Sequence, residues 1–125
     1  MLKTVLKDLA CHDKELSILF TDDERISKLN SQYLGREGPT NVLSFSMIGG
    51  PDPDVFTPML GDVVISVETA LRESKERGES LENTVCRLLI HGILHIFGYD
   101  HEKTEFEAEK MEKEENRLMA LIMEE

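Results

Sequence analysis

Three histidines near the carboxyl end of the chain form the clearest chemical pattern in the sequence. His91, His95 and His101 follow the spacing H-x-x-x-H-x-x-G-x-x-H. Two histidines four residues apart on a helix project from the same face, one turn apart, as two ligands of one metal ion must. Gly98 ends such a helix and lets the chain turn back, so we expect His101 to reach the same point.

A set of three imidazole ligands predicts a catalytic metal centre. Three nitrogens leave the fourth tetrahedral position open for water, and a zinc ion in such a site lowers the pKa of that water to about 7. Imidazole also binds copper, nickel and iron. We expect one Zn²⁺ ion because three histidines and a water molecule form the tetrahedral arrangement typical of catalytic zinc. The alternative is three ordinary core or helix-end histidines, which would leave several buried ring nitrogens without partners.

The residue after the first histidine separates this site from the zinc peptidases with similar spacing. Those enzymes read H-E-x-x-H, and the glutamate is their general base. Gly92 holds that position here and can do no acid–base work, which disfavours a peptidase. Asp100, beside the third histidine, and Asp62, in a predicted strand, are candidates to orient a ligand or take a proton. Their alternative roles are those of a turn residue and a strand-end cap.

Apolar periodicity predicts the elements that must position these residues. Thr21 is predicted to cap one helix, with Glu24 completing a capping box, and Ser80 is predicted to cap the histidine-bearing helix. Strands are predicted at 15–21, 42–47 and 61–66, and helices at 1–10, from residue 21 to near 35, at 67–77, from 81 to about 97, and at 104–123. Three prolines and two glycines in 48–59 predict a mobile surface loop.

Length and composition favour one folded domain, 1–125, since 40% of the 125 residues are hydrophobic. The order of elements predicts an α+β fold, in which a small mixed β-sheet is packed by helices and a zincin-like metal-bearing helix is followed by a turn. The sequence shows neither a membrane-spanning apolar stretch nor a signal peptide, which predicts a cytoplasmic protein.

Charge argues against a protein that coats nucleic acid by bulk electrostatics. The formal net charge is −11, whereas such binding depends on clustered lysines and arginines. Residues 1–50 carry six Lys and Arg against seven Asp and Glu, while residues 51–125 carry eight against eighteen. An anionic ligand is therefore expected nearer to the first part of the chain.

Three motifs in a fixed order carry a resemblance to a known family. Residues 91–101 (HGILHIFGYDH), preceded by residues 39–45 (PTNVLSF) and 61–66 (GDVVIS), resemble the YbeY family of bacterial endoribonucleases. The resemblance covers the chain from about Leu16 onward. It implies a zinc-dependent, single-strand-specific endoribonuclease that acts in maturation of the 3′ end of 16S ribosomal RNA and in quality control of the 70S ribosome. The implied partners are RNA and the ribosome, without DNA or a membrane.

The sequence departs from the family pattern next to the expected cleft. Where the family usually has arginine after an aromatic residue, Leu34 follows Tyr33. Arg36, two residues later, is the candidate to reach the same cleft, where an arginine would clamp a phosphate. Ser46 replaces a common proline, and the sheet is expected to have one strand fewer because the chain begins after the family's usual first strand.

Several residues near this departure are candidates for an RNA-binding rim. Arg25, Lys28 and Arg36 supply positive charge, and Tyr33 or Phe45 supplies a surface on which a base could stack. Their alternative role is a solvated helix face and ordinary core.

Two other functions remain open at this stage. One is a ribosome-assembly or interaction module with structural zinc and little or no nuclease activity, which Leu34 favours. The lack of a fourth protein ligand disfavours it, because structural zinc sites are normally closed. The other is a different metallohydrolase, of which the peptidase form is disfavoured by Gly92. The sequence does not indicate an oligomeric state.

Overall fold

A mixed three-stranded sheet lies at the centre of the computed structural model, which describes residues 5, 8, 14–47, 59–100, 102 and 104–123. The strands are β1 (Glu15–Thr21), β2 (Val42–Ser46) and β3 (Met59–Ser66), in the order β1-β3-β2. Strand β1 runs parallel to β3, and β2 runs antiparallel to it. The small mixed sheet is as predicted, although β2 ends one residue earlier and β3 begins two residues earlier than expected.

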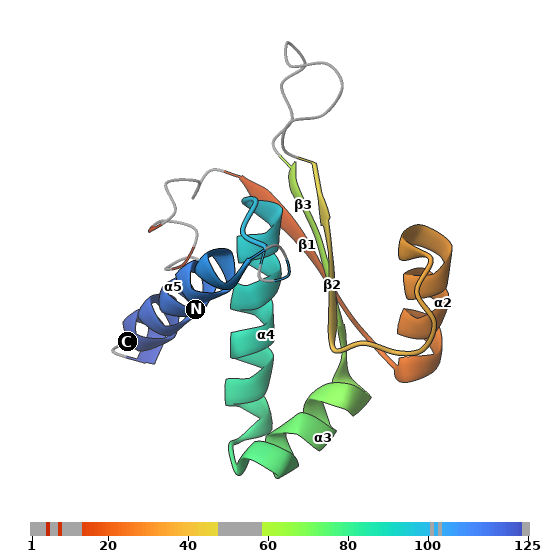
Figure 1. The fold of residues 1–125 in the computed structure, drawn as a ribbon. Coiled ribbons are helices and arrows are strands. Elements are labelled where there is room, and N and C mark those ends of the chain that lie inside the picture. The colour runs from red at the N-terminus through yellow and green to blue at the C-terminus, as the bar shows by residue number, and fades with distance from the viewer. Residues whose placement is uncertain are drawn as a thin grey trace.

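Helices cover both faces of this sheet. They are α2 (Asp23–Leu34), α3 (Val67–Arg77), α4 (Leu81–Ile96) and α5 (Glu105–Met123). Figure 1 shows the sheet nearly edge-on, with α2 on one side, α4 on the other, and α5 packed against α4 away from the sheet. The predicted α+β class is therefore confirmed. The predicted helix 1–10, apart from residues 5 and 8, and the predicted loop 48–59, apart from Met59, lie outside the described residues.

Local capping sets the ends of the helices, with one correction to the prediction. The Asp22 carboxylate caps α2 by accepting the backbone N–H of Arg25 at 2.8 Å. Thr21 does not cap the helix, because it is the last residue of β1 and pairs with Ser66 of β3. The predicted capping box with Glu24 is therefore wrong. Ser80 caps α4 as predicted, by accepting from the N–H of Asn83.

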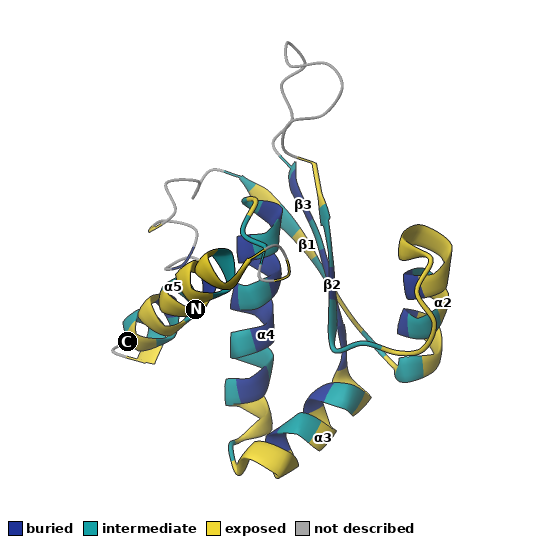
Figure 2. Cartoon of the chain, viewed as in Figure 1, coloured by how far each residue is buried: buried dark blue, intermediate teal, exposed yellow. Residues whose placement is uncertain are grey.

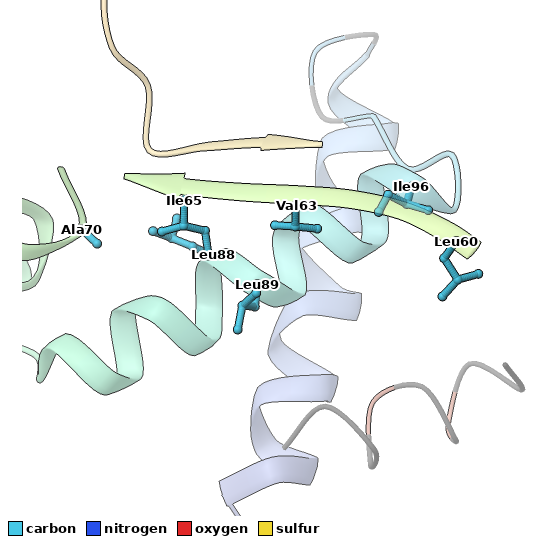
Figure 3. Packing of buried hydrophobic residues seen from close by; sticks show 7 residues of the cluster. All are labelled: Leu60, Val63, Ile65, Ala70, Leu88, Leu89 and Ile96. Atoms are coloured by element: carbon cyan, nitrogen blue, oxygen red, sulfur yellow. The ribbon is translucent and has the colours of Figure 1, made fainter. Parts of the chain in front are cut away.

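The sheet divides the apolar core into two parts, and a third cluster lies between helices. Alternation along β3 directs Val63 and Ile65 toward α4 and Val64 toward α2. Figure 3 shows the cluster between β3, α3 and α4, formed by Leu60, Val63, Ile65, Ala70, Leu88, Leu89 and Ile96. The cluster between α4 and α5 contains Val5, Ile90, Ile93, Leu94, Met111 and Leu118.

Helix α5 buries apolar side chains along the side that faces α4. Met111 and Leu118 are buried there, and most of the remaining surface is exposed (Figure 2). No helix in the described part of the chain is both long and apolar enough to cross a membrane.

Helix α4 approaches the sheet closely at Gly92. A Cβ atom at this position would lie 2.8 Å from Cγ1 of Val63 and 2.9 Å from Oγ of Ser44. The Ser44 hydroxyl donates a hydrogen bond of 2.9 Å to the Gly92 carbonyl, which ties β2 to the helix. Because Val63 is fully buried and stiff at χ1, the sheet has little freedom to give way.

A polar network joins the start of α2 to the start of α3. The Asp23 carboxylate accepts hydrogen bonds from the hydroxyls of Ser66 and Thr69, both at 2.6 Å, and from Nη2 of Arg72 at 2.7 Å. The two hydroxyls and then the guanidinium hold the pKa of Asp23 at about 2. The ionised carboxylate is therefore the form that the fold prefers.

The Gly92 contact predicts a loss of stability on substitution. In Gly92→Ala, overpacking against the sheet costs about 1–3 kcal/mol, and the better helix propensity of alanine returns about 1 kcal/mol. Because the buried Val63 side chain is stiff, we expect the cost to lie in the upper part of this range, which leaves a net loss of about 1–2 kcal/mol in the free energy of unfolding, measured by urea denaturation. Glu82→Ala, at an exposed position of α4, serves as control and stays within about 0.5 kcal/mol of wild type. Equal stability of the two variants would contradict the close approach.

The Asp23 network predicts a dependence of stability on pH. The unfolded carboxyl binds its proton near pH 4, whereas the folded one stays ionised down to about pH 2. The stability that the network contributes is therefore complete above pH 4 and is lost as the pH falls toward 2. We expect the difference in unfolding free energy between wild type and Asp23→Asn to shrink over this interval in urea titrations. A difference that stays constant from pH 6 to pH 2.5 would rule out the network as its source.

Candidate metal centre

Helix α4 holds two of the three predicted ligands side by side. The His91 and His95 rings lie one turn apart with centroids 4.6 Å from each other, and their Nε2 atoms are 3.0 Å apart. Two nitrogens that bind one tetrahedral zinc ion at 2.0–2.1 Å lie about 3.3 Å apart. The pair therefore fits a shared metal ion with little adjustment, and both rings are half-buried.

The chain turns immediately after this pair. Gly98, at φ +95°, donates its N–H to the His95 carbonyl, and the Tyr99 N–H bonds to the Leu94 carbonyl. The third predicted ligand, His101, lies outside the described residues. Among the residues that are described, no group of three or more His, Cys, Asp or Glu side chains is placed to hold a metal ion.

Asp100 bonds to the backbone just beyond helix α4. Its carboxylate accepts the backbone N–H of Glu102 at 2.9 Å, so it joins the residues on either side of position 101. Such a bond across two residues is a common way for aspartate to fix a turn. This contact fits the role of a turn residue for Asp100.

Arg36 reaches this same turn from the other side of the molecule. The segment after α2 carries Arg36, and its Nη2 lies 3.3 Å from Oε2 of Glu102 in an exposed ion pair. Leu34, at the family's usual arginine position, is itself exposed at the end of α2. The structure thus brings Arg36, and with it a positive charge, to the turn that follows the histidine pair.

Asp62 lies away from the histidines, on the opposite face of the sheet. Its neighbour Val63 points toward α4 and meets Gly92, so alternation directs Asp62 toward α2. The sequence pattern places Asp62 and Val64 on one face, but it does not show which face receives the metal-bearing helix. The structure therefore does not bring Asp62 together with His91 and His95.

Asp62 instead borders a groove between α2 and the sheet. The groove has a volume of about 410 Å³. Tyr33, 60% exposed, meets Phe45 edge-to-face, with ring centroids 5.4 Å apart. Within the described part of the chain, the Arg25 guanidinium at its border forms no ion pair or hydrogen bond. The lining residues are Ser17, Leu19, Arg25, Leu29, Tyr33, Phe45, Asp62 and Val64.

One residue at the histidine pair was missed by the sequence analysis. Oε1 of Glu115, on α5, is paired with Nδ1 of His91, and both side chains are about one-fifth to one-quarter exposed. The sequence predicted residues 104–123 only as a helix, without a role for its acidic side chains at the site. Glu115, however, stands between Met111 and Leu118 at the spacing of the buried stripe, and a charged residue at such a position is a detectable signal.

Comparison with known proteins gives a consistent family. The YbeY family model, described as endoribonuclease YbeY, matches residues 1–123. A protein named endoribonuclease YbeY from Syntrophotalea carbinolica is 47% identical over 122 residues, which make up 97% of this chain and 81% of the relative. The protein of that name from Aquifex aeolicus is 45% identical over 120 residues, covering 94% and 76%.

A solved structure shows the same fold. The solution structure of TM1509 from Thermotoga maritima matches with a TM-score of 0.66 and 24% identity, over 97% of this chain and 75% of that one. The family match spans all three sequence motifs and the α4 histidines. With the match to the family model and relatives at 45–47% identity over most of its length, this chain belongs to the endoribonuclease YbeY family.

Proposed function

We propose that this protein is a zinc-dependent endoribonuclease that cuts single-stranded RNA in the cytoplasm. Its role would be maturation of the 3′ end of 16S ribosomal RNA and quality control of 70S ribosomes. Membership in a family of proteins named endoribonucleases supports the reaction class. The observation that carries the metal dependence is the 3.0 Å separation of the His91 and His95 Nε2 atoms.

The proposed metal site uses the two described histidines and His101. Neutral imidazole is a good zinc ligand, and the spacing of His91 and His95 suits one ion. When bound, zinc supplies Lewis acidity, which polarises a phosphoryl oxygen and makes water a better nucleophile. The third ligand is proposed from the sequence motif alone.

The residues around the pair are proposed to bind and orient the substrate. Arg36 stands at the turn after α4, and its guanidinium can donate to two oxygens of one phosphate. Asp100 supports the backbone of this turn through Glu102 and is proposed to act there rather than as the proton acceptor. Asp62 is given no role in bond cleavage, because it lies on the other face of the sheet.

The groove beside α2 supports the preference for single strands. Unpaired bases can stack on an exposed aromatic ring, whereas bases within a duplex cannot leave their neighbours without cost. Tyr33 offers such a ring, and Arg25 offers a charge without a protein partner among the described residues. In a chain of net charge −11, the lining of this groove is neutral because Arg25 offsets Asp62, so the groove repels RNA less than an acidic surface would.

Cleavage of RNA tests the proposed reaction. Zinc-loaded wild type is expected to cut a labelled single-stranded RNA and to spare a duplex of the same sequence. His95→Ala, purified and loaded identically, should lose at least about 100-fold in cleavage rate, because losing a ligand costs no less than losing its supporting partner.

The control for this experiment is His12→Ala, which removes a histidine outside the motif. It should retain wild-type cleavage and zinc content. Equal cleavage by all three proteins would point to a contaminating nuclease and overturn the site. Zinc bound one to one without any cleavage would favour the ribosome-assembly module instead.

Binding of RNA tests the groove independently. Tyr33→Ala should weaken binding of single-stranded RNA by about 5- to 150-fold, which corresponds to the loss of one stacked base at about 1–3 kcal/mol. Fluorescence anisotropy with a short labelled RNA measures this change. Tyr33→Phe should bind almost as wild type. Phe106→Ala removes an even more exposed ring from α5 and should change nothing, so an equal loss in both alanine variants would reject the groove.

A further inference from the structure

We propose that Glu115 is a positioning residue for the metal centre. Its carboxylate holds the His91 ring in the tautomer that carries its proton on Nδ1, so that Nε2 presents a lone pair to the metal. This inference rests on the metal binding proposed above, and it adds α5, which lies outside the three-histidine motif, to the working parts of the site.

The contacts on the two edges of the His91 ring carry the argument. Nδ1 faces Oε1 of Glu115, and an ionised carboxylate can only accept hydrogen bonds. A neutral imidazole has one N–H, so the proton must sit on Nδ1 for this contact to be favourable. Nε2 faces His95 and is then an acceptor, which matches a bond donated by the His95 Nε2–H across 3.0 Å.

Burial makes this choice of tautomer effective. The side chains of His91 and Glu115 are 24% and 19% exposed, so water competes weakly for the Nδ1 proton. Neutral histidine in water usually carries its proton on Nε2, and that form has no lone pair directed at the metal. Without the carboxylate, the free energy of metal binding would be reduced by the cost of exchanging the tautomer and ordering the ring.

The packing of α5 delivers the carboxylate to this place. Glu115 lies between Met111 and Leu118, which are buried against Ile90, Ile93 and Leu94 of α4. Arg117 adds a further restraint by bonding to Glu114 on its own helix and to Asp8 near the amino end. The α4–α5 contact therefore fixes the carboxylate relative to His91.

The test uses metal-free protein at pH 8 as well as metal binding. Long-range ¹H–¹⁵N correlation spectra report which nitrogen of His91 carries the proton, with His91→Asn identifying its signals. Zinc affinity is measured by competition with a chelating dye. Wild type, Glu115→Ala, Glu115→Gln and the control Glu112→Gln are compared. Glu112 is an exposed residue three positions earlier on α5.

The expected results separate positioning from simple structural support. Wild-type His91 should carry its proton on Nδ1, and Glu115→Ala should shift it to Nε2 and weaken zinc binding by about 10- to 100-fold. Glu115→Gln, whose amide oxygen can still accept from Nδ1, should keep the wild-type tautomer with a smaller loss of affinity. Glu112→Gln should match wild type in both measurements.

Two outcomes overturn the inference while leaving the proposed function intact. One is a wild-type His91 with its proton on Nε2, and the other is zinc affinity in folded Glu115→Ala within twofold of wild type. Circular dichroism establishes folding, and Glu115→Gln provides the answer if the alanine variant does not fold. Failure of wild type itself to bind zinc overturns the proposed function, and the metal role of Glu115 falls with it.

Discussion

The close approach of α4 to the sheet is the constraint on which the site depends. At Gly92 the helix backbone lies against Val63 and Ser44 with no room for a side chain. The Ser44 hydroxyl bonds to the Gly92 carbonyl, and the Ser46 hydroxyl bonds to the Ile96 carbonyl one turn later. These contacts fix both the rotation of α4 about its own axis and its distance from the sheet. This rotation directs the side of α4 that carries His91 toward Glu115 of α5.

The same constraint explains why this site cannot use the acid–base arrangement of the H-E-x-x-H peptidases. A glutamate at position 92 would have to pass through the space that Val63 and Ser44 occupy. The position next to the first histidine is therefore a packing position in this fold. A carboxylate reaches the histidine pair from α5 instead, where Glu115 contacts Nδ1 of His91. One face of α4 therefore packs against the sheet, and another face carries the histidine pair.

Much of this arrangement was predictable because its causes are local. The serine cap and the helical spacing of α4 are set within a few residues, and so are the four-residue separation of the histidines and the turn at Gly98. The cap of α2 was misassigned because Thr21 and Asp22 are both capping residues. Only pairing with Ser66 in β3 shows that Thr21 belongs to the strand. The positions of Asp62 and Glu115 relative to the histidines depend on tertiary structure. Placing Asp62 requires knowing which face of the sheet α4 covers, and placing Glu115 requires knowing that α5 packs beside α4.

The ion pair between Arg36 and Glu102 has a consequence for how salt affects association with a polyanion. Each cation that meets a phosphate normally releases counterions from the nucleic acid, and this release makes binding steeply dependent on ionic strength. Arg36 already has an anionic neighbour, held at 3.3 Å on the turn after α4. A phosphate that binds Arg36 has to displace this carboxylate, so the arginine exchanges one anionic partner for another. Exchange at this position therefore adds less to the salt dependence than an unpaired arginine would.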